Sequence, residues 1–511
     1  MKIFEFLKEK YHSRPLFFIM VVALVPRLIA AVFAKGYGMH DDMFGPVQAM
    51  QELLDDFATI HNDTPKLILY PIVQYVIFAI SEFLGIFEPQ TKMYIVRFVH
   101  AFYSLLVVYF SYKITLIVSN RENAKIVGML TALLWMLPYM SVRNLVELAV
   151  VPPVLAATYF LLKYFYEDQS LSISKNSISK RQVKYLILSG FFFGISFATR
   201  FQTALVPLGI GLVLIFRRQW KEFAILTFTT LFVSALFIGV LEYLIWHQPF
   251  QSLIDYVSYN STSYGNYPNS PWYMVVVLII GVLLPPMGVL LFYAYLRTWK
   301  KYILLFLPTL CYILFHSIYP NKQERFILTI LPMVLILCII GFKEWTDNST
   351  WWKKHKKILK NNWIWFWSIN TILLILFIFT YSKKTRVESF TYLSKKNITS
   401  IVIELNETDT YFAPVFYLGK NKDKNIYYMY SEYDPENYRN LLNNNFPNYI
   451  IFFDSNDLEE RKNKFKNSYN CDIKLDKLIK PSLLDNILYY MNPKHNKNYN
   501  AYIYNIIQNQ N

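Results

Sequence analysis

The chain has 511 residues, of which 54% are hydrophobic and only 17% charged, and its mean hydropathy is +0.25. Soluble proteins carry about 25% charged residues, so this composition argues against a soluble fold and favours an all-α, multi-pass membrane protein. The net charge of +16 would suit nucleic-acid binding. However, basic residues between hydrophobic runs follow the positive-inside rule, and we expect no nucleic-acid partner.

The first predicted element is a membrane span that ends in AVFAK. Its length, together with Pro26 and Arg27 inside it, favours an uncleaved span over a signal peptide. MHDDMF follows, and in this segment His40 precedes two adjacent carboxylates, Asp41 and Asp42. Charged groups beside a span are costly unless they are paired or functional, so both carboxylates are candidate functional residues.

Basic residues mark alternate loops between the later apolar runs. The positive-inside rule assigns these loops to the cytoplasm and leaves a long first outer loop over residues 37–90. The apolar segment 67–86 would reverse this order if it crossed the bilayer, so we interpret it as an interfacial or re-entrant helix. About eleven spans are then expected. The loops assigned to the cytoplasm contain Lys8, Lys10, Arg14, Arg121, Lys125, residues 175–184, Arg217, Arg218, Lys221, Arg297, Lys300, Lys301 and residues 351–360.

Polar residues collect in the loops assigned to the outer face. Arg and Lys hold phosphate groups and stabilise the charge on a leaving phosphate, while a carboxylate can remove a proton from an acceptor hydroxyl. The set therefore predicts transfer of a group from a phosphate at the outer membrane surface. Its members are Asp41, Asp42, Arg143, Glu147, Arg200, Lys322, Glu324 and Arg325.

The composition changes after residue 383 to Asn, Lys and Tyr. Short apolar runs such as TSIVIEL and NIYYMY alternate there with polar, helix-compatible stretches, which predicts a small soluble α/β domain. Asparagine-rich disorder is the alternative interpretation. We expect a transmembrane catalytic domain over residues 1–382 and a C-terminal domain on the outer side over residues 383–511.

Several motifs resemble those of the GT-C membrane glycosyltransferases, above all glycosyltransferase family 22, the α-mannosyltransferases of GPI-anchor and N-glycan assembly and their bacterial relatives. The resemblance extends from about residue 14 to residue 345. MHDDMF is similar to the family's His-Pro-Asp-Glu signature, and SVRNLVE to its Arg-Thr-x-Ser-Asn-x-x-Glu turn. TRFQTAL, YGNYPNSPWY and NKQERF resemble the motifs that follow. The fold expected from this resemblance is GT-C-like.

The resemblance implies that Asp42 is the general base, which deprotonates an acceptor hydroxyl so that direct displacement inverts the anomeric carbon. Asp41 is the alternative base, because a shift of one residue in the alignment exchanges the two carboxylates. The leaving phosphate would be neutralised without a metal or other cofactor by Arg200, Lys322 and Arg325.

A divalent metal is the alternative to this cationic site, with the two adjacent carboxylates and Glu147 as its oxygen ligands. The chain also departs from the family pattern. Asp41 and Met43 replace the proline and glutamate of the signature, and Asn321 and Gln323 replace the histidine and glutamate of the last motif. These departures affect the predicted sugar and linkage more than the predicted reaction.

The remaining candidates are residues expected to bind substrate. Arg143 belongs to the second motif. His40 either orients the base, binds the leaving phosphate or is an interfacial residue. Tyr264, Trp272 and the neighbouring Tyr273 either stack on a sugar or form an aromatic belt at the membrane surface.

Together these features predict an inverting membrane glycosyltransferase. It would move a hexose, with mannose favoured, from a polyprenyl-phosphate donor to a lipid-linked glycan or another outer-face acceptor. Its site would face the periplasm from a bacterial inner membrane or the lumen from the ER membrane. One alternative is a flippase or transporter of lipid-linked saccharide, although the chain lacks the evident repeat typical of transporters. Another is a GT-C transferase that acts on lipid A or on protein.

Overall fold

The protein is described here by a computed structural model, which covers residues 9–56, 67–166, 180–262, 270–320, 322–405, 413–430, 446–493 and 496–508. The chain divides into two compact units. The first, called the helical unit below, comprises Met1–Ala31, Asp56–Gln74 and Arg97–Ile378. The second, called the sheet unit, comprises Val32–Asp55, Tyr75–Val96 and Phe379–Asn511.

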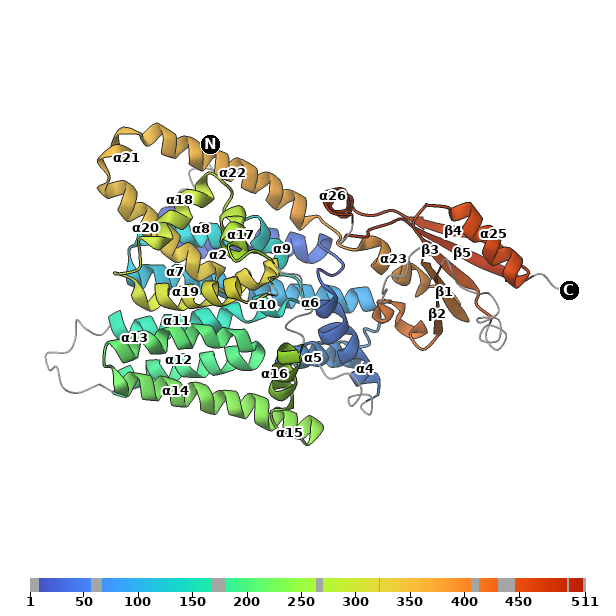
Figure 1. Ribbon diagram of the computed structural model, residues 1–511, viewed down its shortest axis with the longest axis horizontal. Helices are drawn as coiled ribbons and strands as arrows, with labels where there is room; N and C mark the ends of the chain where they lie inside the picture. The colour runs from blue at the N-terminus through green and yellow to red at the C-terminus, as the bar shows by residue number, and fades with distance from the viewer. Residues whose placement is uncertain are drawn as a thin grey trace. The chain divides into compact units, whose positions relative to one another are not determined.

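The helical unit is built from apolar helices joined by short turns, and α12 packs between α11 and α14 (Figure 1). Three helices, α2 (Pro15–Phe33), α5 (Leu69–Phe83) and α6 (Pro89–Tyr103), contribute residues to both units. The other helices of this unit are α7 (Leu105–Val118), α8 (Arg121–Leu133), α9 (Met136–Met140), α10 (Val146–Ala149), α11 (Val151–Tyr166), α12 (Lys180–Thr199), η3 (Phe201–Ala204), α13 (Leu205–Phe216), α14 (Trp220–Ala235), η4 (Leu236–Val240), α15 (Leu241–Trp246), α16 (Gln251–Thr262), α17 (Met274–Val282), α18 (Met287–Leu296), α19 (Ile303–Ile318), η6 (Glu324–Thr329), α20 (Leu331–Asn348), α21 (Thr350–Lys354) and α22 (Lys356–Ile378).

Several of these helices are long and apolar enough to cross a membrane, which supports a multi-pass membrane protein. Within the described ranges, five meet both criteria: Pro15–Phe33, Pro89–Val118, Val146–Tyr166, Trp220–Trp246 and Lys356–Ile378. Five shorter apolar helices accompany them, including α5, which contains most of the predicted re-entrant segment. The expected number of about eleven spans stays a prediction.

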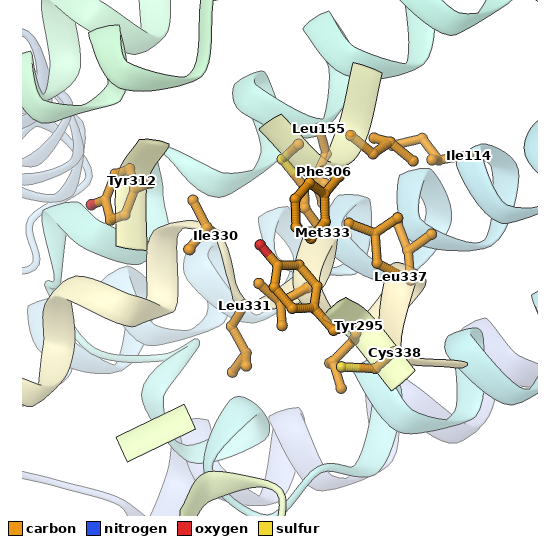
Figure 2. Close-up of a cluster of buried hydrophobic side chains, with 14 of the residues drawn as sticks. Ile114, Leu155, Tyr295, Phe306, Tyr312, Ile330, Leu331, Met333, Leu337 and Cys338 are labelled. Carbon is orange, nitrogen blue, oxygen red and sulfur yellow. The ribbon is translucent and has the colours of Figure 1, made fainter. Parts of the chain in front are cut away.

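The core of the helical unit is centred on α20. All residues from Leu331 to Phe342 are buried, and α20 packs against α7, α8, α18 and α19. Figure 2 shows Leu337 of α20 among Tyr295, Leu155 and Ile114, which come from three other helices. A helix that is hydrophobic on every side is buried on every side, so α20 is the element around which the others are arranged.

A buried arginine joins α2 to α8. Arg27 is 1% exposed and donates hydrogen bonds to Ser104 Oγ (3.0 Å) and to the backbone oxygens of Ala23, Thr131 and Ala132 (2.9–3.1 Å). Hydrogen-bond acceptors within the protein therefore satisfy the N–H groups of Arg27, which makes the role of this residue structural.

The sheet unit contains a five-stranded mixed sheet in the order β2-β1-β3-β5-β4. β1 is parallel to β2 and to β3, whereas β5 is antiparallel to β3 and to β4. The small sheet predicted for the C-terminal region is therefore present. The elements of this unit are α3 (His40–Met43), η1 (Phe44–Gln48), α4 (Ala49–Asp55), α23 (Lys384–Leu393), β1 (Ser400–Leu405), η7 (Val415–Asn421), β2 (Asn425–Tyr430), β3 (Tyr449–Phe453), α25 (Leu458–Tyr469), β4 (Cys471–Ile479), α26 (Leu483–Met491) and β5 (Ala501–Gln508).

Side chains alternate between the two faces of this sheet, as strand geometry requires. On one face Ile401 and Ile403 of β1 pack with Phe390 of α23. That cluster also includes Val47 and Phe78 from the N-terminal segments of the same unit, so these segments share a core with the sheet. On the other face the intervening residues of β1 and β3 pack against α25.

Candidate active site

The site in the helical unit starts at the turn between α9 and α10. Arg143 lies in this turn, 4% exposed, with its guanidinium 4.5 Å from the centre of the Tyr139 ring. Glu147 follows in the first turn of α10 and is 1% exposed. The backbone oxygen of Glu147 accepts a hydrogen bond from Thr329 Oγ1 at 3.4 Å, which joins α10 to η6. The SVRNLVE motif therefore places a carboxylate inside the protein.

Two arginines from distant parts of the chain meet this carboxylate. Glu147 Oε1 lies 2.8 Å from Nη1 of Arg200, which follows α12, and 3.1 Å from Nε of Arg325, in η6. The Arg200 guanidinium also lies 5.1 Å from the centre of the Phe326 ring. Two buried guanidinium groups thus share one carboxylate oxygen, which leaves an excess of one positive charge in this cluster.

Several polar atoms of the cluster have unused hydrogen-bonding capacity. Considering only the described residues, Glu147 Oε2, Arg200 Nε, Arg200 Nη2 and Asn144 Oδ1 are buried without a hydrogen-bond partner. Each such atom costs about 1–3 kcal/mol, and native proteins keep few of them. Their concentration around one ion cluster indicates a site whose hydrogen bonds a bound molecule would complete.

Two residues near this cluster were not among those predicted from the sequence. Tyr312 and His316 lie one turn apart on α19, 1% and 2% exposed, with ring centres 4.5 Å apart. His316 also contacts the Phe326 ring, with 5.1 Å between the ring centres. The Tyr312 hydroxyl and both ring nitrogens of His316 lack hydrogen-bond partners among the residues described. Figure 2 shows the Tyr312 hydroxyl pointing away from the other labelled side chains of the core.

The residues of the NKQERF motif lie in different environments. Arg325 is 9% exposed, and its Nε also donates to Gln323 Oε1 at 2.8 Å. Lys322 is half-buried, and its Nζ donates to the backbone oxygen of Ser270 at 2.9 Å. Lys322 therefore does not join the ion cluster around Glu147 directly, whereas Arg325 does.

The two candidates from MHDDMF belong to the sheet unit. His40 is exposed at the start of α3 and stacks on Phe44 with 4.2 Å between ring centres. Asp42 is 5% exposed, and its Oδ2 accepts a hydrogen bond from the backbone N–H of Met39 at 3.2 Å. This bond fixes the Asp42 carboxylate within the short α3 helix. The side chain of Asp41 lies outside the described part of the chain.

The predicted aromatic contacts are exposed where the structure describes them. Trp272 is 71% and Tyr273 51% exposed, and their rings meet edge to face at 5.9 Å. Exposed aromatic residues next to a membrane helix are typical of an interfacial belt. Tyr264 lies outside the described residues.

The described ranges contain no group of three or more His, Cys, Asp or Glu side chains that could hold a metal ion. Of the three oxygen ligands considered for a metal, Glu147 is instead in contact with Arg200 and Arg325. Two guanidinium groups would compete with a cation for this carboxylate.

The fold resembles solved structures over most of the chain. ArnT from Cupriavidus metallidurans bound to undecaprenyl phosphate has a TM-score of 0.60 at 12% identity, covering 86% of this chain and 93% of ArnT. The Archaeoglobus fulgidus oligosaccharyltransferase in complex with zinc and sulfate has a TM-score of 0.54 at 13% identity, covering 88% and 69% of the two chains. AglB from the same organism, bound to an inhibitory peptide and a dolichol-phosphate, has a TM-score of 0.50 at 11% identity, covering 90% and 71%. No curated protein sequence matches the chain.

The fold is therefore that of the GT-C membrane glycosyltransferases. The sequence profile of the Alg9-like mannosyltransferase family matches residues 4–403, and the chain belongs to this family. It is a glycosyltransferase with mannosyltransferase-like activity, which confirms the class predicted from the motifs.

Proposed function

We propose that this protein transfers a mannose from a polyprenyl-phosphate carrier to a lipid-linked glycan, with inversion at the anomeric carbon. The observation that carries the proposal is the buried cluster in which Arg200 and Arg325 share one oxygen of Glu147. The excess positive charge and the unpartnered nitrogens of Arg200 suit a phosphate oxygen, because guanidinium groups bind phosphate through charge-assisted hydrogen bonds.

The proposed donor agrees with what related folds bind. ArnT binds undecaprenyl phosphate and AglB binds a dolichol-phosphate, each a phosphate on a long isoprenoid chain. In the present chain, Arg143 and Arg27 line one small pocket together with His100 and with apolar residues, among them Val107, Leu145 and Leu148.

In the proposed reaction the acceptor hydroxyl oxygen forms a bond to C1 of the sugar while the bond from C1 to the phosphate oxygen breaks. Asp42 takes the hydroxyl proton, with Asp41 as the alternative base. The electron pair leaves with the polyprenyl phosphate, and Arg200 and Arg325 stabilise its charge. Because attack comes from the face opposite the leaving group, the anomeric configuration inverts. We propose that no metal takes part and that the site faces the periplasm or the ER lumen.

Tyr312 and His316 would bind hydroxyl groups of the sugar in this proposal. Their unpartnered polar atoms can donate to or accept from a hydroxyl, and their aromatic faces suit the apolar side of a pyranose. Both residues lie in the last two turns of α19. A polar pair four residues apart in an apolar helix is the sequence signal that could have identified them.

The decisive experiment supplies the purified full-length protein with synthetic polyprenyl-phosphate-mannose and a lipid-linked oligosaccharide. We expect a mannosylated glycan of inverted anomeric configuration, detected by mass spectrometry and NMR, and undiminished transfer in excess EDTA. Loss of transfer in EDTA with recovery on adding Mg²⁺ or Mn²⁺ would contradict the metal-free mechanism. Transfer to lipid A or to peptide, with none to the glycan, would contradict the proposed acceptor.

A further inference from the structure

A groove of about 610 Å³ lies in the helical unit, at the end where α2 begins and α7 finishes. Three basic side chains line it: Arg14 before α2, Lys113 on α7 and Arg121 at the start of α8. Its other lining residues are aromatic or apolar, among them Phe17 and Leu116. The groove therefore combines concentrated positive charge with an apolar wall.

No ion pair in the described part of the chain involves the three basic residues that line the groove. The neighbouring Glu122, outside the lining, forms its ion pair with Lys125 at 2.5 Å and also interacts with Arg121. Within the described ranges, no carboxylate lines the groove beside Arg14 or Lys113.

Lys113 is the most informative of the three residues. It interrupts the apolar sequence of α7, LLVVYFSYKITLIV, within a segment long and apolar enough to span a membrane. A lysine in such a segment is costly unless a partner balances its charge. The Nζ of Lys113 lies over the Tyr109 ring, 5.8 Å from the ring centre. The position of Lys113 therefore calls for an anionic partner at the membrane surface.

Arg121 is held toward the groove by the backbone. Its Nη2 donates to the carbonyl oxygens of His12 and Ser13, at 2.9 and 3.1 Å. These bonds fix the guanidinium beside the start of α2, where it also interacts with Tyr112 and Glu122. A fixed guanidinium next to two further basic side chains is suited to a phosphate group.

The surroundings of the groove favour a lipid over a soluble anion. Phe17 is 67% and Leu116 40% exposed, and both lie on helices predicted to cross the membrane. Apolar side chains exposed on such helices face acyl chains. A ligand with its phosphate on the basic residues would therefore have its hydrocarbon chain along Phe17 and Leu116.

We propose that this groove binds the phosphate of an anionic glycerophospholipid. Arg121 belongs to a loop that the positive-inside rule assigns to the cytoplasm, and Lys113 lies in the last two turns of α7, which lead to that loop. Anionic lipids attract basic segments at this face. The site is separate from the cluster around Glu147 and does not depend on the proposed reaction. Its occupant would stabilise α2, α7 and α8 against one another.

The test measures retention of lipids by the purified full-length protein with native mass spectrometry. Phosphatidylglycerol, phosphatidylcholine and undecaprenyl phosphate are supplied separately to wild type, Lys113→Met, Lys113→Arg and Lys163→Met. Lys163 is the matched control, because it also lies on an apolar helix with its Nζ over a tyrosine ring but does not line the groove. We expect wild type to bind phosphatidylglycerol at least about tenfold more tightly than phosphatidylcholine, since each basic residue near a membrane surface favours anionic lipid about fivefold.

Lys113→Met should weaken phosphatidylglycerol binding about fivefold, Lys113→Arg should restore it, and Lys163→Met should have no effect. Equal binding of the two phospholipids would overturn the proposal, as would an equal loss in the Lys163 control. Retention of undecaprenyl phosphate without phosphatidylglycerol would also overturn it, because the groove would then be a second site for the carrier. Thermal unfolding of each variant in phosphatidylcholine nanodiscs separates lost binding from lost folding.

Discussion

Arg461 of the sheet unit and Arg200 of the helical unit are buried in opposite ways. In the sheet unit, Arg461 of α25 is 7% exposed, pairs with Glu404 and donates to the backbone oxygens of Asn456 (3.1 Å) and Asp454 (3.0 Å). In the helical unit, Arg200 is 6% exposed, touches one shared carboxylate oxygen and leaves two nitrogens without hydrogen bonds. Burial alone therefore does not distinguish these two arginines, whereas their unused hydrogen-bonding capacity does.

The largest effect should come from comparing two buried carboxylates of the sheet unit, Asp42 and Glu404. We expect Asp42→Asn to lower the transfer rate about 10²–10⁴-fold, the usual contribution of a general base, without changing the unfolding temperature. Glu404→Gln should leave the transfer rate of the folded protein unchanged, because Glu404 lies in the buried pair with Arg461. Rates with saturating donor and melting curves of the purified variants would measure both. Asp41→Asn should keep measurable activity; the reverse order would assign the base to Asp41.

A second test compares Arg461 with Arg200 directly. Arg461→Leu removes one partner of a closed buried pair and should lower the free energy of unfolding by about 3–5 kcal/mol. Arg200→Leu should instead lower transfer about 10²–10³-fold, as loss of a group that stabilises the transition state does, and destabilise the protein far less. Denaturant unfolding and transfer assays on both variants provide the comparison. Equal destabilisation by the two substitutions would show that Arg200 is as structural as Arg461.

The geometry of the phosphate site can be tested at Arg325. Arg325→Lys keeps the charge but loses the planar fork that holds two phosphate oxygens. One lost charge-assisted hydrogen bond is worth about 1.5–3 kcal/mol, so transfer should fall about 10–100-fold. Lys322→Arg should be milder, because Lys322 donates to the Ser270 carbonyl rather than to the cluster. Wild-type rates in Arg325→Lys would reduce Arg325 to a positive charge beside Glu147.

The smallest effect concerns how the stability of the protein depends on pH through the buried pair of Glu404 and Arg461. Burial raises the pKa of Glu404 to about 7, although the Arg461 guanidinium opposes this rise. A carboxyl whose folded pKa exceeds its unfolded value of about 4.3 makes the protein less stable as pH rises through that interval, because the unfolded state loses its proton first. Wild type should therefore lose about 2–3 kcal/mol of stability between about pH 4.5 and 7 relative to Glu404→Gln. Parallel pH profiles for the two proteins would contradict the raised pKa.

The sequence predicted the fold class and the participants in the ion cluster, for a physical reason. Charges at the ends of apolar spans are costly, so Glu147, Arg200 and Arg325 could be selected before their contacts were known. The alternating runs of the C-terminal region likewise predicted the strands that became β1, β2 and β3. Both signals are local in the chain.

What the sequence did not predict depends on long-range packing. Tyr312 and His316 lie in an apolar helix, where aromatic residues usually belong to the core. The surrounding contacts alone reveal that their polar atoms are unpartnered. Nor does local periodicity indicate that Val47 and Phe78 share a core with a sheet formed several hundred residues later. Lys322 matched its motif, but its Nζ donates a hydrogen bond to the Ser270 carbonyl and not to the ion cluster.

In the proposed reaction, the carboxylate oxygen shared by Arg200 and Arg325 would also affect how quickly the enzyme turns over. Each cycle would end with a spent carrier whose phosphate is more highly charged than that of the donor, and two uncompensated guanidinium groups would retain it. Glu147 would compete with that phosphate for the same N–H groups and so shorten the residence time of the product. Glu147→Gln should accordingly convert polyprenyl phosphate into a tight product inhibitor, with a normal first turnover and a slow steady state.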